Sequence, residues 1–462
     1  MVKLTTALLV ALGVTGASAT NGFVKRQASS SSRHHTRTST ATLSATAAAP
    51  TSTFTGSLPA SVLSIVTTIS SGEGNPTATV ALATTFSAGA QNAQITNAPK
   101  LPSLSTVLPA NFPALDQVPP IDSPQAKAWI SAIDFSKVPS VGQTVDGASC
   151  ASNPTNLANA GADKNCWWSC GGCTRDTDIT TCPDKNTWGL SYDDGPSPYT
   201  PQLLDYLDEH NLKSTFFVVG SRAISRPDML QTEYMSGHQI SVHTWSHPAL
   251  TTLTNEQIVV ELAWTREVIR QITGVTPNTM RPPYGDIDDR VRAICAQMNL
   301  TPIIWTSTSP SENYDTNDWK IGAGTVSAAE VVYNFEQILA NASKLPTGYI
   351  VLAHDLYQQS VELATEVVLP AALSMSPKQN ILPIIECLNK PLGDAYVETN
   401  RNISGSQPTA TASGSASVKP TSSSSTSSSA GSSSGASGAS SVPLKVPALL
   451  LGSAFLGALA LL

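Results

Sequence analysis

Short apolar runs alternate with helical patterns between residues 182 and 400. The runs lie at 187–193, 214–219, 239–243, 279–281, 300–305, 348–354 and 381–385. Helical patterns are predicted between them, near 200–211, 226–236, 255–273, 288–298, 328–342 and 361–375. Such repeated strand–helix units predict a parallel sheet covered by helices. Roughly seven units in this length favour an α/β fold with a distorted or partial (β/α) barrel over an open sheet.

The two ends of the chain differ from this region in composition. Residues 20–144 are rich in Ser, Thr, Ala and Pro, and residues 401–441 are dominated by Ser, Gly and Ala. Such segments bury too little apolar surface to offset the entropy of ordering, so we expect disordered, O-glycosylated stalks. The net charge of −7, without a basic stripe, argues against a nucleic-acid partner.

Both termini carry targeting patterns. Residues 1–19 have a Lys near the start, an apolar run and a small-residue cleavage site, which predict a secretory signal peptide. Residues 442–462 form an apolar tail after the small-residue tract, which predicts a removed signal for a glycosylphosphatidylinositol (GPI) anchor, with Ser434 as the attachment residue. A tail-anchored helix is the alternative. We therefore expect a secreted protein, GPI-anchored at the outer face of the plasma membrane or transferred to the cell wall.

The secretory context changes how the cysteines and sequons are interpreted. All seven cysteines lie between 150 and 387, and disulfides are favoured in secreted proteins. Four of them belong to a Cys-rich extension at 145–181, where a structural zinc is the alternative and the connectivity stays open. The neighbouring Trp167 and Trp168 either stack on sugar rings or fill a disulfide core. Asn-X-Ser/Thr sequons predict N-glycosylation at Asn299, Asn341 and Asn402.

Ionisable residues end several of the apolar runs. Asp193 and Asp194 end the first run, and adjacent side chains of a strand point to opposite faces. His243 ends the third run and His247 follows after a turn, since Pro248 disfavours a helix there. Two histidines and a strand-end aspartate suit zinc or a similar divalent ion. A polar turn and solvated surface histidines are the ordinary alternatives.

Later runs add further charged candidates. Arg281 precedes two prolines and is suited to pair with a carboxylate. Asp315 and Asp318 lie in a loop that is either solvated or functional, and His354 is either a satisfied core histidine or a catalytic one. Because functional side chains gather where barrel strands end, the regular occurrence of such residues favours one shared site.

Five ordered motifs carry a family resemblance. LSYDDGP (190–196), HTWSH (243–247), RPPYG (281–285), DTNDW (315–319) and LAH (352–354) resemble those of carbohydrate esterase family 4, the polysaccharide deacetylases with a NodB homology domain. Together with the targeting signals, they look most like the fungal chitin deacetylases. The resemblance implies metal-dependent hydrolysis of the N-acetyl groups of GlcNAc units in chitin, giving chitosan and acetate. Deacetylation of peptidoglycan or xylan, or a non-catalytic wall mannoprotein, are the alternatives.

The resemblance also implies roles for individual residues. Asp194, His243 and His247 would hold one Zn²⁺ or Co²⁺ ion, and Asp193 would be the general base. The backbone N–H of Tyr284 would stabilise the oxyanion.

Further residues would complete the site by the same resemblance. His354 would protonate the leaving amine, with its pKa raised by Asp318, while Arg281 would orient the base. Trp319 and Leu352 would wall a pocket for the acetyl methyl group. The first motif has Ser-Tyr where Thr is more frequent, and the long loop before Trp319 leaves Asp315 as an alternative to Asp318.

The resemblance finally implies a disulfide between Cys182 and Cys387 that ties the ends of the domain, which leaves Cys295 as a buried thiol. The expected organisation is a signal peptide at 1–19, a low-complexity region at 20–144, the extension at 145–181, the deacetylase domain at 182–400, a stalk at 401–441 and a removed tail at 442–462.

Overall fold

The computed structural model describes residues 58–69, 80–309 and 312–401. The chain divides into two units, Met1–Ser404 and Gly405–Leu462, and the described residues all belong to the first. The predicted signal peptide, the sequon at Asn402, the stalk, Ser434 and the apolar tail lie outside the described residues. In the described part of the chain, no helix combines the length and the apolar character needed to cross a membrane.

Parallel strands form the centre of the molecule. A five-stranded sheet has the order β2-β3-β4-β5-β6, a second has the order β10-β1-β9, and β7 and β8 form an antiparallel hairpin. The strands are β1 (Thr187–Gly189), β2 (Ser191–Asp193), β3 (Thr215–Val218), β4 (Gln239–Val242), β5 (Thr279–Met280), β6 (Thr301–Pro302), β7 (Ser307–Ser309), β8 (Glu312–Asn313), β9 (Tyr349–Ile350) and β10 (Asn380–Leu382).

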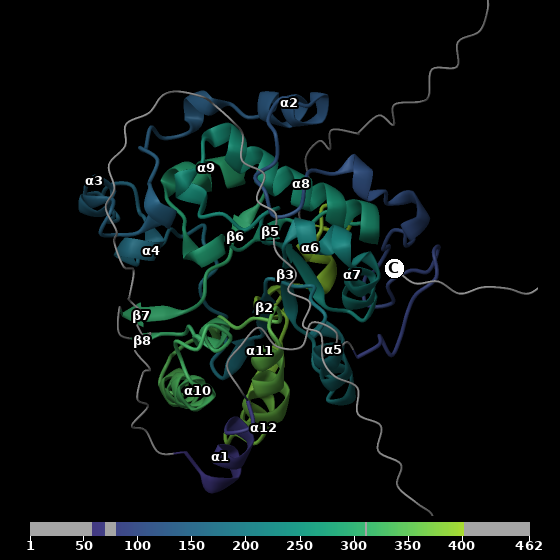
Figure 1. The fold of residues 1–462 in the computed structure, drawn as a ribbon, viewed down its shortest axis with the longest axis vertical. Coiled ribbons are helices and arrows are strands. Elements are labelled where there is room, and N and C mark those ends of the chain that lie inside the picture. Colours follow the sequence, from purple (N-terminus) through teal and green to yellow (C-terminus); the bar gives the residue numbers. More distant parts are fainter. Residues whose placement is uncertain (1–57, 70–79, 310–311, 402–462) are drawn as a thin grey trace, which may run out of the picture. The chain divides into compact units, whose positions relative to one another are not determined.

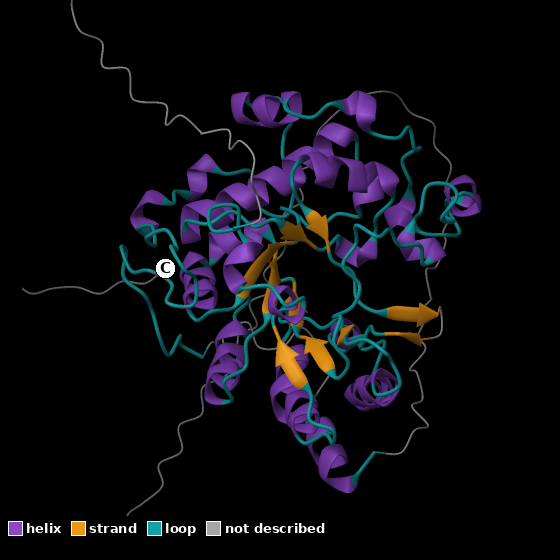
Figure 2. Cartoon of the chain, turned by 180° about the vertical axis from the view of Figure 1, so that it is seen from behind, coloured by secondary structure: helices purple, strands orange, loops and turns teal. Residues whose placement is uncertain are grey.

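The two parallel sheets share one continuous segment. The predicted strand at 187–193 is interrupted at Leu190, so β1 pairs with β9 and β10 while β2 pairs with β3. Beyond β6, the N–H of Thr306 donates to the carbonyl of Ile350, 3.0 Å away, which links that end back to β9. The strands therefore form the expected α/β fold with a distorted, incomplete barrel, and Figure 2 shows them gathered at the centre with helices around them.

The helices follow the predicted pattern closely. The helix at 255–273 begins where Thr254 and Gln257 cap each other and ends at Gly274, whose φ of 85° is favourable for glycine. The helices are α1 (Ala60–Val66), α2 (Pro124–Ser131), α3 (Pro154–Ala158), α4 (Trp168–Gly171), α5 (Thr200–Glu209), α6 (Gly220–Ser225), α7 (Pro227–Met235), α8 (Asn255–Thr273), α9 (Asp289–Gln297), α10 (Ala328–Ala342), α11 (Gln358–Leu363), α12 (Leu369–Leu373) and α13 (Ile384–Cys387) (Figure 1). A π-helical turn, Ala364–Val368, divides the predicted helix at 361–375 into α11 and α12.

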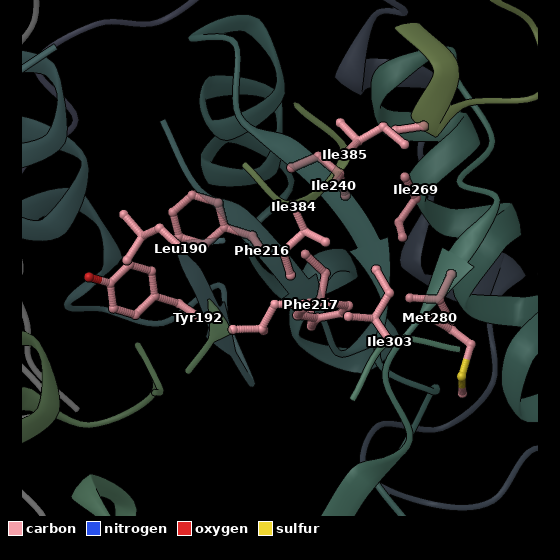
Figure 3. Packing of buried hydrophobic residues seen from close by; sticks show 14 of the residues in the cluster. Leu190, Tyr192, Phe216, Phe217, Ile240, Ile269, Met280, Ile303, Ile384 and Ile385 are labelled. Carbon is pink, nitrogen blue, oxygen red and sulfur yellow. The ribbon is translucent and has the colours of Figure 1, made fainter. Parts of the chain in front are cut away.

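The core lies between the strands and the surrounding helices. Every residue of β3 is buried, including the consecutive Phe216 and Phe217, because this central strand is covered on both faces. They share one core cluster with Ile240 of β4, Met280 of β5 and Ile269 of α8, which Figure 3 labels. This packing fixes the strand ends from which the functional side chains project.

The prediction of a disordered region at 20–144 is wrong for residues 80–144, and also for residues 58–69, which include α1 and pack into a second core cluster. Ile95, Leu101 and Val107 belong to the main core cluster, together with Ala126 and Ile133 near α2. This segment needs no core of its own, because its sparse apolar residues pack onto the helices of the barrel. Composition alone gave no signal of that docking surface.

The Cys-rich extension is also integrated into the barrel. Disulfides join Cys150 to Cys170 and Cys166 to Cys173, so these cysteines are not zinc ligands. Trp167 and Trp168 are both buried. Trp167 packs with Ala148 and Ala160 in the core of the extension, whereas Trp168 belongs to the main core and meets the Trp305 ring. The bridge between Ile179 and Ile303 begins the sheet pairing before the predicted boundary at 182.

The remaining cysteines lie as the resemblance implied. A disulfide joins Cys182 to Cys387 across the ends of the domain, and Cys295 of α9 is a buried free thiol. Of the sequon asparagines in the described residues, Asn299 is exposed and Asn341 is half-buried. N-glycosylation of both stays a prediction.

Candidate active site

Three predicted metal ligands meet at the carboxyl ends of β2 and β4. One donor atom each from Asp194, His243 and His247 lies within 4.8 Å of the others. The Oδ1 atom of Asp194 is 3.1 Å from Nε2 of His247 and 3.5 Å from Nε2 of His243. That oxygen is buried and accepts no hydrogen bond in the described part of the chain. A carboxylate oxygen and two imidazole nitrogens around a common point suit a zinc-like ion.

The protonation states of His243 and Asp194 also favour metal binding. The Nδ1 atom of His243 lies 2.7 Å from the carbonyl of Arg281, which sets Nδ1–H as donor and leaves the Nε2 lone pair toward the triad. Burial, together with the nearby His247, holds the pKa of His243 well below its ordinary value. Burial alone would raise the pKa of Asp194, but His247 and Arg222 hold it well below the usual range. A neutral imidazole and an ionised carboxylate are the forms that bind a cation.

Asp193 lies beside the triad but has a different partner. Its Oδ1 accepts a hydrogen bond of 2.6 Å from Nη1 of the fully buried Arg281, whose guanidinium also lies 4.0 Å over the ring of Phe217. The other oxygen, Oδ2, is 3.8 Å from Nε2 of His243 and therefore faces the triad. Burial raises the pKa of Asp193 to about 6 against the opposing charge of Arg281. Such a carboxylate is ionised yet basic enough to accept a proton near neutrality.

His354 faces the same space from beyond β9. A parallel bridge pairs it with Asp193, and its Nδ1 lies 2.7 Å from Oδ1 of Asp318. Burial disfavours the imidazolium, but the Asp318 carboxylate more than compensates and raises the pKa of His354 to about 10. Of the two loop aspartates, Asp318 is therefore the one that contacts His354. Asp315 instead accepts a hydrogen bond from the backbone N–H of Asn317.

The RPPYG segment forms the adjoining wall. Tyr284 has a φ of 60°, in the left-handed region that non-glycine residues rarely adopt. Its ring lies 4.7 Å from that of His247, in an edge-to-face arrangement. Gly285 follows with a φ of 64°, and a Cβ there would collide with Trp168 of the Cys-rich extension. The extension therefore supports the loop that carries Tyr284.

A cavity of about 370 Å³ joins these groups. Trp319 and Leu352, predicted to wall a pocket, both line it, and the Trp319 ring is 39% exposed. The full lining is Asp193, Asp194, Arg222, His243, His247, Tyr284, Trp305, Asp315, Trp319, Leu352, His354, Leu356 and Tyr357. A larger cavity of about 670 Å³ lies beside β5 and β6, but its lining contains neither histidine nor cysteine.

Two charged residues at this site were not predicted from the sequence. Arg222 of α6 donates from Nη1 to the carbonyl of Asp194, 2.7 Å away, and lines the cavity. Its position just after the apolar run 214–219 was the available signal. Glu261 of α8 accepts hydrogen bonds from the turn between the two histidines. It interrupts the apolar stripe of α8, which marks a buried carboxylate.

Comparison with known proteins agrees with this geometry. A family model described as polysaccharide deacetylase matches residues 180–303. Chitin deacetylase 1 of Cryptococcus neoformans var. grubii is 58% identical over 350 residues, which cover 75% of this chain and 72% of that protein. The chain belongs to the polysaccharide deacetylase family.

Two further relatives of this polysaccharide deacetylase have lower identity. The chitin deacetylase of Amylomyces rouxii is 37% identical over 294 residues, which cover 61% of this chain and 66% of that protein. The solved structure of the chitin deacetylase from Colletotrichum lindemuthianum is 28% identical. The matched region covers 47% of this chain and 94% of the Colletotrichum chain, with a TM-score of 0.41.

Proposed function

We propose that this polysaccharide deacetylase removes N-acetyl groups from the GlcNAc units of chitin, giving chitosan and acetate. The observation that carries the proposal is that Asp193 and His354, paired across neighbouring segments, line the same cavity as the Asp194–His243–His247 triad. The close relative named chitin deacetylase 1 supports chitin as the substrate.

The chemistry follows from the two flanking groups. Oδ2 of Asp193, the oxygen that Arg281 does not bind, accepts a proton from the attacking water. The water oxygen bonds to the acetyl carbon, and the backbone N–H of Tyr284 donates to the developing oxyanion. His354 is protonated because of Asp318, and it gives its Nε2 proton to the amine nitrogen as the C–N bond breaks.

The ion that we propose for the triad is Zn²⁺ or Co²⁺. The Oδ1 of Asp194, which accepts no hydrogen bond in the described residues, and the inward Nε2 of His243 fit such an ion. When bound, the metal would lower the pKa of water and polarise the acetyl carbonyl. Because a ligating carboxylate has little basicity left, the neighbouring Asp193 is needed as a separate base.

Acetate release distinguishes the proposed substrate from its rivals. The full chain, loaded with Zn²⁺, should release acetate from chitin oligomers but little from acetylxylan or from peptidoglycan. Preference for either of the other polymers would reassign the substrate. Absence of acetate release from all three, while chitin is still bound, would favour the non-catalytic wall mannoprotein.

We also propose that the enzyme acts at the cell surface. The supporting observations are the signal pattern at 1–19, the small-residue tract and the apolar tail at 442–462. On intact cells, a phosphatidylinositol-specific phospholipase should release the protein, and Ser434→Leu should reduce the released amount. Protein that stays membrane-bound after this treatment would indicate the tail-anchored helix.

A further inference from the structure

We infer that Glu261 is a positioning residue of the metal site: it fixes the turn between the two histidine ligands and so sets the affinity for the divalent ion. The inference rests on the metal site of the proposed function. Glu261 belongs to α8 and lies outside the five motifs of the family resemblance, and its side chain does not line the catalytic cavity.

The turn itself is held in an unfavourable conformation. Thr244, directly after the first histidine, has a φ of 65°, and His247 has a φ of 60°. Both values lie in the left-handed region, which costs a non-glycine residue free energy unless surrounding contacts determine it. The Nε2 atoms of both histidines can face Asp194 only while this turn keeps its shape.

Glu261 provides three of those contacts. Its Oε2 accepts the backbone N–H of Trp245 at 2.7 Å and that of Ser246 at 2.9 Å. Its Oε1 accepts the Ser246 hydroxyl at 2.5 Å. The side chain is fully buried, and in the described part of the chain it forms no ion pair with a lysine or arginine. A buried carboxylate is costly without hydrogen bonds, and among the described residues those of the Glu261 carboxylate all come from the turn.

The opposite side of the turn is held by α6. The N–H groups of Gly220 and Ser221 donate to the carbonyls of Thr244 and Trp245, at 2.9 and 3.0 Å. Gly220 allows this approach, since a Cβ there would lie 2.5 Å from the Trp245 ring. The carbonyls of Thr244 and Trp245 are thus bound by backbone N–H groups, whereas the N–H groups of Trp245 and Ser246 depend on the Glu261 side chain. The N–H of His247 donates to the Thr244 hydroxyl within the turn, at 3.0 Å. Glu261 is therefore the group whose change loosens the histidines.

Two substitutions separate the effect of side-chain length from that of charge. Glu261→Asp keeps the charge but withdraws the carboxylate by one methylene, whereas Glu261→Gln keeps the length and an oxygen that can accept both backbone N–H groups. Isothermal titration of the metal-free full chain with Zn²⁺ gives the affinity. We expect Glu261→Asp to bind Zn²⁺ about 10- to 100-fold more weakly than wild type, as is usual when a group that orients metal ligands is lost. Glu261→Gln should be affected less.

Activity at excess metal provides the readout that a purely structural role would not give. Acetate release by Glu261→Asp should recover as Zn²⁺ is raised, because the ligands themselves are intact. Glu267→Asp is the matched control, since its half-buried carboxylate lies on the same helix but pairs with Arg270 instead of the turn. It should bind Zn²⁺ as wild type does.

Three outcomes would overturn the inference. They are wild-type affinity in folded Glu261→Asp, a weaker affinity in Glu261→Gln than in Glu261→Asp, and a loss of activity that no Zn²⁺ concentration restores. If wild type itself binds no Zn²⁺, the proposed metal site fails instead, so the two failures are distinguishable.

Discussion

The Asp318 carboxylate holds His354 at two points: Oδ2 accepts the backbone N–H at 2.8 Å and Oδ1 accepts the Nδ1–H at 2.7 Å. These bonds fix the tautomer and turn Nε2 toward the cavity. They also counter burial, which disfavours the imidazolium, and raise the pKa of His354 to about 10. One carboxylate thus both orients the proposed acid and keeps it protonated.

Replacing Asp318 should move the alkaline limit of activity. His354 acts in its protonated form, so kcat falls as pH rises through its pKa. Asp318→Asn removes the charge that raises this pKa, and the falling limb should shift to lower pH by roughly one unit or more. The measurement is kcat for acetate release against pH. Asp315→Asn is the control and should not shift the fall of kcat at high pH, since Asp315 accepts a hydrogen bond from Asn317. Equal pH profiles for the two variants would show that Asp318 does not raise the pKa of His354.

Loss of the base should separate catalysis from metal binding. Asp193→Asn keeps an oxygen for the Arg281 hydrogen bond but cannot accept a proton. We expect kcat to fall about 10²- to 10⁴-fold, with Zn²⁺ affinity within a few-fold of wild type. Initial rates and calorimetry on the same preparation test this. Unchanged acetate release would remove Asp193 from the mechanism.

Chelation should abolish activity reversibly. Removal of the ion with a chelator and dialysis should stop acetate release, and Zn²⁺ or Co²⁺ should restore it. His243→Ala should bind neither ion at concentrations that saturate wild type, because it removes one of three ligands. His210→Ala, at an exposed histidine, serves as the control. Activity that is indifferent both to chelation and to His243→Ala would contradict a metal role.

The docked N-terminal segment should contribute to stability. The Phe112 ring stacks on Trp245, with centroids 6.0 Å apart, and meets the edge of Trp264. Phe112→Ala should lower the free energy of unfolding by about 2 kcal/mol, a value reduced from that of a fully buried ring because Phe112 is only partly buried. Urea unfolding measures the change. Leu108→Ala, at a residue 52% exposed, should have little effect, and equal values for the two would argue against docking.

The disulfide across the domain ends should stabilise the fold strongly. Cys182 and Cys387 are 205 residues apart in sequence, so the bond restricts the unfolded chain over a long loop. Replacing both with Ser should cost about 2–5 kcal/mol in the free energy of unfolding. Urea unfolding of the double variant and of wild type provides the measurement. A double variant as stable as wild type would show that the disulfide contributes little.

Much of the barrel could be predicted from periodicity. The helices at 255–273 and 328–342 have the predicted bounds, because amphipathic spacing and capping residues are local signals. The break at Leu190 could not be predicted, since it depends on which neighbours β1 and β2 meet. The prediction of disorder for residues 80–144 was wrong for the same reason, because their order depends on distant neighbours. Their apolar side chains are too sparse for a core of their own, but suffice against a surface formed by distant helices.

Some residues of the candidate site could be predicted from the sequence and others could not. Residues that end strands, such as Asp194 and His243, were accessible because parallel strands bring their ends together. The roles within the set came from the ordered motifs rather than from spacing. Arg222 and Glu261 were missed because their importance arises from contacts with backbone groups of other segments. Their positions beside an apolar run and within an apolar stripe indicate a buried charge, but do not show which backbone groups it meets.

Anomalous X-ray scattering from a crystal of the Zn²⁺-loaded protein tests most directly whether the triad shares one ion. We expect a single peak within bonding distance of Asp194 and of the Nε2 atoms of His243 and His247, with Asp193 outside the coordination sphere and bound to Arg281. A peak elsewhere, or one in which Asp193 is a ligand, would contradict the division of roles between the two adjacent aspartates.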